Sequence, residues 1–271
     1  MEFSVLGLVL GAVVGLILAL AGAGGGILAV PLLVFGLHMT IMQAAPVGLI
    51  AVGAASALGA VLGLREGLVR YRAAALIGIT GMLLAPLGVQ LAGMIPNRPL
   101  MVAFALVLAR VAWRMFKQAR GGATPEQATP QMPCVLNPDE GRLIWTLPCA
   151  WALAGTGAVS GVLSGLLGVG GGFVIVPCLT RYTNLAVRSI FATSLAVIAL
   201  VSIGGVTAAA WQGTVAWSIA APFALGAVTA LLAGRLVAAR IAGARLQQGF
   251  AVTSAVVSVL LLGRGLGWIA A

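Results

Sequence analysis

Apolar segments separated by short polar segments occupy most of the chain and define its predicted elements. In the first half, the apolar runs cover residues 4–21, 27–37, 41–64, 73–95 and 100–116. In the second half, they cover residues 143–167, 173–179, 190–210, 217–239 and 246–262. A helix needs about 20 apolar residues to cross a bilayer core, and most of these runs approach or exceed that length. The run at 27–37 is only about half a membrane deep at ~1.5 Å per residue.

An internal duplication explains why the two halves look alike. The segment GAGGG at residues 22–26, followed by Pro31, returns 146 residues later as GVGGG at residues 168–172, followed by Pro177. The same offset, carried without a gap, pairs further identical residues: Gly15 with Gly161, Leu49 with Leu195, Ser56 with Ser202, Gly59 with Gly205, Gly67 with Gly213, Gly88 with Gly234, Leu100 with Leu246 and Phe104 with Phe250. A register held over about ninety residues indicates duplication rather than chance glycine enrichment.

A polar segment joins the two copies. Residues 117–142 contain three acidic residues and four prolines, so this segment cannot be a membrane span. We therefore predict a first transmembrane repeat at residues 1–117, a flexible linker at residues 118–142 and a second transmembrane repeat at residues 143–271. The first apolar run lacks a preceding basic region and belongs to the repeat through Gly15, so we do not interpret it as a cleaved signal peptide.

Composition places the chain in the bilayer. Hydrophobic residues make up 61% of the chain, charged residues 7%, and the mean hydropathy is +1.15. Such a chain has too little polar surface to cover a soluble globule, so we predict a polytopic membrane protein. The net charge of +10 does not indicate a nucleic-acid partner, because the basic residues lie singly or in small groups at the ends of apolar runs. In those positions they act as topology signals.

The positive-inside rule separates two topologies. Eight full spans, with the halves as parallel repeats, would place nine of the fifteen basic residues on one side and six on the other. If the glycine clusters turn the chain back, each half is a re-entrant helical hairpin plus three transmembrane helices, and thirteen of the fifteen fall on the linker side. We therefore predict an all-α fold of two inverted repeats, with the termini outside and the linker in the cytoplasm. Eight spans stay the alternative, because the arm before each cluster is nearly long enough to cross.

The two glycine clusters are the predicted substrate site. Backbone that leaves helical geometry at membrane depth must be satisfied by protein or by a water-filled cavity, and glycine permits the unusual dihedrals. The short helices that follow, starting near Ile27 and Phe173, would present free N–H groups and a positive dipole end to an anion. We therefore assign the following residues to an anion site: Gly24, Gly25, Gly26, Gly170, Gly171 and Gly172. For isolated glycines such as Gly11 and Gly15, close helix packing is the better interpretation, and it is the alternative for the clusters.

Four hydroxyl side chains are candidate donors to the same anion. Thr193 and Ser194 lie at the start of a span in the second half, while Ser56 and Ser202 pair across the repeats one or two turns deeper. The alternative is that these hydroxyls bond back to their own helix or to a neighbouring one, as hydroxyls in membrane helices often do.

The duplicated G-x-G-G-G-x-x-x-x-P motif, the FATSL segment at residues 191–195 and the size of the half-repeat together resemble the sulfite exporter TauE/SafE family of bacterial membrane permeases. The resemblance implies a multi-pass transporter of the bacterial cytoplasmic (inner) membrane that moves small sulfur-containing anions such as sulfite or organosulfonates. The first half departs from the pattern, because Val47-Gly48 stands at the position of Thr193-Ser194. The hydroxyl contribution to the site is therefore expected to be one-sided.

We expect this transporter to export anions by alternating access without a coupling ion. All five acidic residues lie outside the predicted spans, so a carboxylate-based proton or sodium relay has no support. With the cytoplasm negative, moving one negative charge outward gains ~2.3 kcal/mol per 100 mV. The membrane potential alone can therefore drive export.

Other function classes find less support in the sequence. No Ser-His or Asp-Asp constellation is expected at membrane depth, the single histidine, His38, is badly placed for catalysis, and the sequence has no metal-ligand cluster. We therefore expect no enzyme, no metal and no cofactor. A non-transporting membrane scaffold or assembly factor is the alternative function. The expected partners are a small anion and the bilayer, with a homodimer left open. The cysteines Cys134, Cys149 and Cys178 show no paired spacing, so free thiols are expected.

Overall fold

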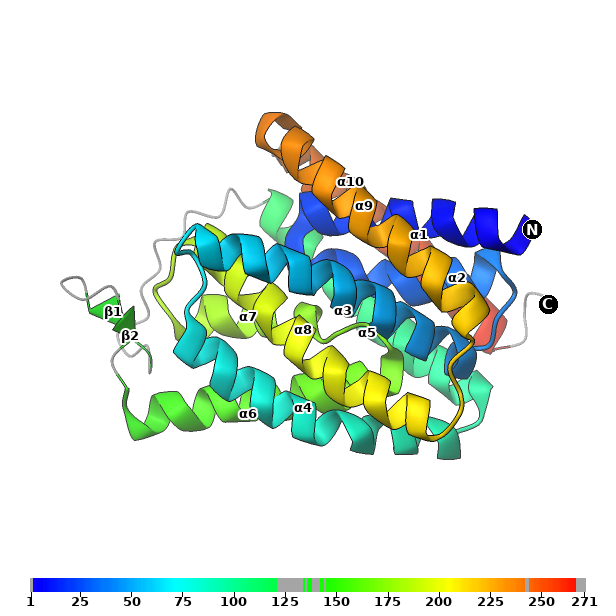
Figure 1. The fold of residues 1–271 in the computed structure, drawn as a ribbon, viewed down its shortest axis with the longest axis horizontal. Coiled ribbons are helices and arrows are strands. Elements are labelled where there is room, and N and C mark those ends of the chain that lie inside the picture. The colour runs from blue at the N-terminus through cyan, green and yellow to red at the C-terminus, as the bar shows by residue number, and fades with distance from the viewer. Residues whose placement is uncertain are drawn as a thin grey trace.

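The computed structural model describes residues 2–120, 134, 136–137, 142–143, 145–241 and 244–266, which form a helical bundle (Figure 1). The first half contains α1 (Glu2–Ala21), the 3₁₀ helix η1 (Gly22–Leu28), α2 (Ala29–Gly36), α3 (Ile41–Arg65), α4 (Tyr71–Met94) and α5 (Asn97–Arg120). The second half contains α6 (Leu147–Leu167), α7 (Gly172–Tyr182), α8 (Val187–Trp211), α9 (Trp217–Ile241) and α10 (Ala244–Gly265). Between the halves, β1 (Leu136–Asn137) pairs antiparallel with β2 (Arg142–Leu143). The predicted all-α class is confirmed, whereas most of the predicted linker lies outside the described residues.

Five helices in the described part of the chain are long and apolar enough to cross a membrane: α3, α4, α6, α8 and α9 as far as Arg235. They confirm a multi-pass membrane protein. Because α6 precedes the second glycine cluster, that arm of the predicted hairpin has the length of a full span. α5 covers the predicted run at residues 100–116 but is not among the five. Arg110 and Arg114 lie within that run, and basic side chains lower its hydropathy.

Equivalent turns in the two halves have the same backbone conformation. The turn after α3 contains Gly67 with a φ of 68°, and the turn after α8 contains Gly213 with a φ of 67°. In both turns the next residue, Leu68 or Thr214, donates its N–H back to a carbonyl in the last turn of the preceding helix. This left-handed ending is typical of glycine after a helix. The 146-residue offset therefore relates local conformation as well as sequence.

The first helix of each half packs on the other half. α1 runs parallel to α9, because a Cβ added at Gly11 would meet the carbonyl oxygen of Phe223 and one added at Gly15 would meet that of Ala227. The equivalent contacts join α6 to α4: Gly157 to Ile77 and Gly161 to Gly81. Glycine allows helix backbones to approach this closely in a membrane. The packing interpretation of Gly11 and Gly15 is confirmed, and the two halves are interlocked.

α3 and α8 are the most deeply buried of the five span-length helices, and they run antiparallel (Figure 1). A Cβ added at Gly59 would lie 2.9 Å from Leu195, and the equivalent contact joins Gly205 to Leu49. Each of these contacts becomes the other when the repeat offset is applied. The equivalent helices α3 and α8 therefore run in opposite directions.

The two ends of the bundle differ in the chain segments that they contain. α5 and α10 run antiparallel between these ends. Ser258 of α10 donates a hydrogen bond from Oγ to the carbonyl oxygen of Ala105 in α5 at 2.8 Å. We call the end that holds the start of α1 and the end of α10 the terminal end. We call the end that holds the end of α5, the start of α6 and the β1–β2 pair the linker end (Figure 1). Arg70 and Arg188, at the starts of α4 and α8, lie at the linker end.

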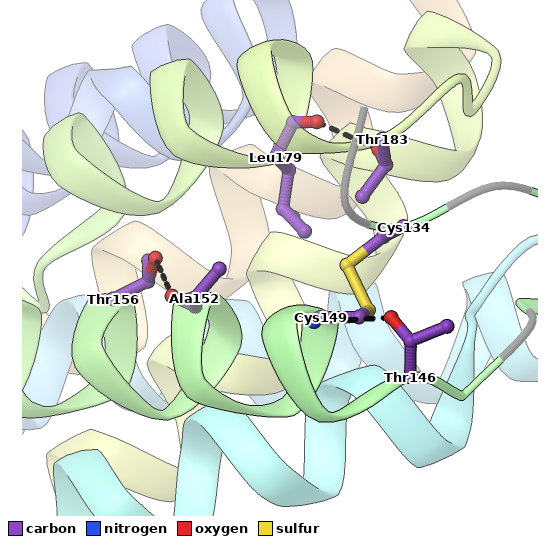
Figure 2. Close-up of a disulfide and its surroundings, with 7 residues drawn as sticks. All are labelled: Cys134, Thr146, Cys149, Ala152, Thr156, Leu179 and Thr183. Carbon is purple, nitrogen blue, oxygen red and sulfur yellow. Dashed lines mark hydrogen bonds between the residues drawn. A yellow bond between two sulfur atoms is a disulfide. The ribbon is translucent and has the colours of Figure 1, made fainter. Parts of the chain in front are cut away.

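A disulfide at the linker end corrects the expectation of free thiols. Cys134 and Cys149 are bonded, with their Cα atoms 5.0 Å apart, while Cys178 is free and partly buried. The N–H of Cys134 also donates to the carbonyl oxygen of Tyr182, and Cys134 forms a β-bridge with Thr183. Figure 2 shows the disulfide and the position of Thr183 next to Cys134. Residue 134 thus joins the start of α6 to the end of α7. The sequence could not show this approach, because it depends on where the linker returns to the bundle.

Candidate functional site

Each glycine cluster turns the chain back on itself. In the first half, Gly36 at the end of α2 packs on Leu10 of α1. In the second half, Gly171 packs on Ser160 of α6, and Cys134 links the end of α7 to the start of α6. The open ends of the first hairpin therefore lie at the terminal end of the bundle, and those of the second lie at the linker end.

The two hairpins have long first arms and short return helices. α1 reaches far toward the linker end. A Cβ added at Gly22, just after α1, would lie 3.0 Å from the ring of Phe191 near the start of α8. The equivalent residue Gly168 packs on Ala45 near the start of α3. Both arms thus cross nearly the whole bundle. The return helices α2 and α7 begin further in, after the glycine segments.

The two glycine clusters meet between α3 and α8. A Cβ added at Gly26 would lie 3.1 Å from the carbonyl oxygen of Val169, which belongs to the second cluster, and 2.9 Å from Val52 of α3. One added at Gly170 would lie 2.7 Å from Ile198 of α8 and 3.2 Å from the same Val52. The structure therefore brings together the two predicted halves of the site. Gly24 and Gly25 lie in η1 beside this contact.

The backbone differs between the two clusters. In the second cluster, Gly168, Gly170 and Gly171 have φ values of 70°, 76° and 74°, a left-handed conformation that glycine adopts without steric cost. α7 then begins at Gly172, as the sequence predicts within one residue. In the first cluster, η1 continues to Leu28 and delays the start of α2. No side chain caps the N-terminus of α2 or α7, so no hydroxyl or carboxylate satisfies the first-turn N–H groups of these helices.

Two predicted hydroxyls have structural partners. Thr193 is fully buried, and its Oγ1 accepts a hydrogen bond of 3.0 Å from the N–H of Arg70 at the start of α4. Ser194 is also fully buried and donates to the carbonyl oxygen of Phe191 at 2.9 Å. These contacts match the alternative interpretation, in which each hydroxyl serves a helix backbone.

The other two predicted hydroxyls have no such partner. Ser56 is 0% exposed and Ser202 is 3% exposed, and within the described part of the chain neither Oγ has a hydrogen-bond partner. A Cβ added at Gly53, one turn from Ser56, would lie 3.0 Å from Oγ of Ser202, so both serines face the α3–α8 interface. Buried hydroxyls are nearly always satisfied, which makes this pair the candidate ligand donors.

Two serines that the sequence analysis did not single out extend the site. Ser160 and Ser164 lie one turn apart on α6 and are both fully buried. Ser160 packs on Gly171 and donates to the carbonyl oxygen of Gly157 at 3.2 Å, whereas Oγ of Ser164 has no partner among the described residues. The equivalent positions in the first half hold Val14 and Leu18. The signal that could have revealed these serines is a polar residue in one repeat at a position where the other repeat has an apolar residue.

Arg235 is the second feature that the sequence analysis missed. It lies inside the predicted span at residues 217–239, yet it was interpreted only as a topology marker. In the structure its guanidinium forms an ion pair of 3.1 Å with Glu66, which caps the end of α3. A charged residue within a span is itself a signal for function.

The groups near the cluster contact that could bind a ligand include several hydrogen-bond donors. The described residues hold no group of three or more His, Cys, Asp or Glu side chains that could bind a metal ion. Backbone N–H groups at the start of α7 lie beside this contact, and the unpartnered hydroxyls of Ser56, Ser164 and Ser202 lie on the helices around it. Such donors suit a small oxyanion.

The helical bundle, with five span-length helices among the described residues, defines the class as a multi-pass membrane protein. Residues 7–261 match the family described as sulfite exporter TauE/SafE. The chain belongs to this family, and it is a membrane transporter of the bacterial inner membrane.

Two curated relatives agree with this assignment. A probable membrane transporter protein of Xylella fastidiosa strain Temecula1 is 30% identical over 238 residues, covering 87% of this chain and 85% of the relative. A probable membrane transporter protein of strain 9a5c is 29% identical over 236 residues, with coverage of 87% and 85%. No solved structure matches the chain.

Proposed function

We propose that the protein exports small sulfur-containing oxyanions or organosulfonates, such as sulfite, by alternating access between two inverted repeats. The observation that carries this proposal is the contact of the two glycine clusters, where Gly26 lies against Val169 between α3 and α8. In this proposal the anion is held at that contact by the N–H groups at the start of α7 and by Ser56 and Ser202.

Charge and hydrogen-bonding capacity support an anion rather than a cation. The start of α7 presents N–H groups and the positive end of a helix dipole, and each unpaired serine can donate one further hydrogen bond. The five acidic residues of the sequence all lie outside the segments that form the cluster contact. A cation at this position would meet no carboxylate.

The contacts of the two halves support alternating access. A cavity of about 30 Å³ opens near the terminal end, lined in part by Leu49, Gly165 and Gly205. At the linker end, Phe191 packs on Gly22 and Leu195 packs on Gly59. The equivalent contacts, Leu49 with Gly205 and Ala45 with Gly168, lie on the terminal side of the cluster contact. In this proposal, alternating access loosens the contacts of one end at a time. This transport role requires no catalysis.

Anion-dependent stabilisation of the purified protein tests the proposal. A ligand that binds only the folded state raises its stability, so sulfite or another sulfur oxyanion is expected to raise the unfolding temperature. The panel is sulfite, sulfate, thiosulfate, sulfoacetate, taurine, acetate and chloride. The double variant Ser56→Ala/Ser202→Ala is expected to lose the shift.

The matched control is Thr207→Ala, which removes an exposed hydroxyl of α8 that bonds only to its own helix. It is expected to keep the shift. No stabilisation by any anion of the panel would sink the proposed site and favour the scaffold alternative, which has no reason to bind small oxyanions.

A further inference from the structure

An ion pair lines a groove at the linker end of the bundle. Nη2 of Arg235 in α9 lies 3.1 Å from Oε1 of Glu66, and Nη1 donates to the carbonyl oxygen of Gly59 in α3 at 3.4 Å. The groove is lined by Leu62, Glu66, Leu232, Ala233 and Arg235. The side chains of Arg235 and Glu66 are 31% and 52% exposed, so solutes at this end can reach both.

The equivalent corner of the other half contains no charge. The position of Arg235 is held by Val89 and that of Glu66 by Gln212 when the repeat offset is applied. Both of these residues line the cavity near the terminal end. The fold therefore forms the same helix junction without an ion pair, and the charges at the linker end are an addition that the architecture does not require.

Stability does not account for the pair either. Partly exposed ion pairs add little to the folding free energy, because solvent screens them and two long side chains lose freedom. A charged residue in a membrane-spanning helix is unfavourable and is usually linked to function. The residue that carries this charge is an arginine, whose planar fork matches the oxygens of carboxylate and of other oxyanions.

The pair also lies over the contacts that close the linker end. Arg235 bonds to the carbonyl of Gly59, and Gly59 is the residue against which Leu195 of α8 packs. One turn earlier on α8, Phe191 covers Gly22 at the turn of the first hairpin. Arg235 therefore lies beside these contacts at the linker end.

We propose that Arg235 is the oxyanion-binding residue at the linker-end mouth of the transport path, and that the carboxylate of Glu66 occupies its guanidinium until an incoming anion displaces it. This inference rests on the proposed transport function. The ligand class is a small oxyanion with two or more oxygens able to take parallel N–H donors, such as sulfite or a sulfonate. Breaking the Glu66 contact frees α9 from α3 at the point where the linker end must open.

Transport kinetics of charge variants in liposomes test this assignment. Initial rates of sulfite flux are measured against sulfite concentration for the wild type, Glu66→Gln, Arg235→Gln and Arg235→Lys. Glu66→Gln is expected to lower KM several-fold, because the competing carboxylate is gone. Arg235→Gln is expected to raise KM about tenfold, the effect of losing a charge-assisted hydrogen bond. Arg235→Lys is expected to fall between Arg235→Gln and wild type, since the charge stays and the fork is lost.

Arg72→Gln is the matched control, because it removes one exposed positive charge from the same end. Its KM is expected to equal that of the wild type. Equal rises in KM for Arg72→Gln and Arg235→Gln would overturn the assignment and leave only a general effect of surface charge. Unchanged KM in both Glu66→Gln and Arg235→Gln would overturn it as well.

Two further outcomes are distinguishable. If the guanidinium binds a lipid phosphate, adding phosphatidylglycerol to phosphatidylcholine liposomes will change the wild-type rates and leave those of Arg235→Gln unaffected. The KM for sulfite will then be the same in both proteins. That result overturns the assignment of Arg235 to the substrate. If the wild type moves no sulfur oxyanion at all, the proposed function fails, and direct binding of sulfite to the Glu66→Gln variant then decides whether Arg235 is an anion site. Absence of that binding overturns the inference.

Discussion

At the scale of single residues, the left-handed glycines of the second cluster combine two constraints. Gly170 has a φ of 76°, and an added Cβ would lie 2.7 Å from Ile198 and 3.2 Å from Val52. Any larger residue therefore meets both backbone strain and side-chain contact at the place where the two halves join. Gly213 has nearly the same φ, 67°, but an added Cβ there meets nothing within 4 Å. Comparing the two positions separates strain from the effect of the cluster contact.

Gly170→Ala is predicted to abolish most anion flux, because the new methyl group separates the cluster contact from α8. Both Gly170→Ala and Gly213→Ala are predicted to lower stability by about 1–2 kcal/mol from the left-handed backbone, with an added loss at Gly170 from crowding. Unfolding temperatures in detergent and flux in liposomes are the two measurements. Normal flux in Gly170→Ala, or equal loss of flux in both variants, would argue against a site at the cluster contact.

At the scale of elements, the hairpins depend on glycine in two different ways. The clusters supply the turn, while regularly spaced glycines of α1 and α6 supply the close packing of the long arms. Gly161 of α6 lies against the backbone of Gly81 in α4, whereas Gly155 on the same helix faces open space. Without hydrophobic driving force between helices in lipid, such close backbone packing is a main source of association.

Gly161→Ala is predicted to destabilise the protein, because its methyl group would overlap the backbone of α4 and force the two helices apart. Gly155→Ala is predicted to leave stability unchanged or to raise it by up to about 1 kcal/mol, since alanine favours the helix over glycine. Thermal unfolding of the two variants in detergent provides the comparison. Equal stability of both variants would contradict the packing role assigned to Gly161.

Much of this arrangement could be predicted from the sequence, because turns and close packing leave a signature in one residue type. The duplicated clusters gave the hairpins and the start of α7 at Gly172. The remaining features arise from contacts between distant segments. The Arg235–Glu66 pair joins residues 169 apart, and the approach of Ser160 to Gly171 depends on how α7 folds back on α6. No local pattern records such contacts, so they appear only once the helices are placed.

At the scale of the whole molecule, two features of the linker end point to different compartments. The excess of basic residues at this end favours the cytoplasm, where disulfides are normally reduced. The Cys134–Cys149 bond is typical of an oxidising compartment. The distribution of thirteen of the fifteen basic residues is a stronger indicator of topology than one cysteine pair. The prediction that the linker end is cytoplasmic therefore stands.

A cytoplasmic linker end predicts that cellular reductants open the Cys134–Cys149 bond in growing cells and that the bond seen in the structure forms again on oxidation. The cells are lysed into N-ethylmaleimide, and the state of the pair is read by mass spectrometry in a Cys178→Ser background. A sample oxidised after lysis serves as the control, because it must show the bond. A fully formed disulfide in the trapped sample would place the linker end on the oxidising side and reverse the predicted orientation.

The most direct test of the whole account is sulfite flux in liposomes at controlled potassium diffusion potentials, without proton or sodium gradients. Moving one negative charge gains ~2.3 kcal/mol per 100 mV, so sulfite is predicted to leave the negative compartment at a rate that rises with the potential. Flux that ignores the imposed potential and appears only with a proton or sodium gradient would contradict potential-driven anion export.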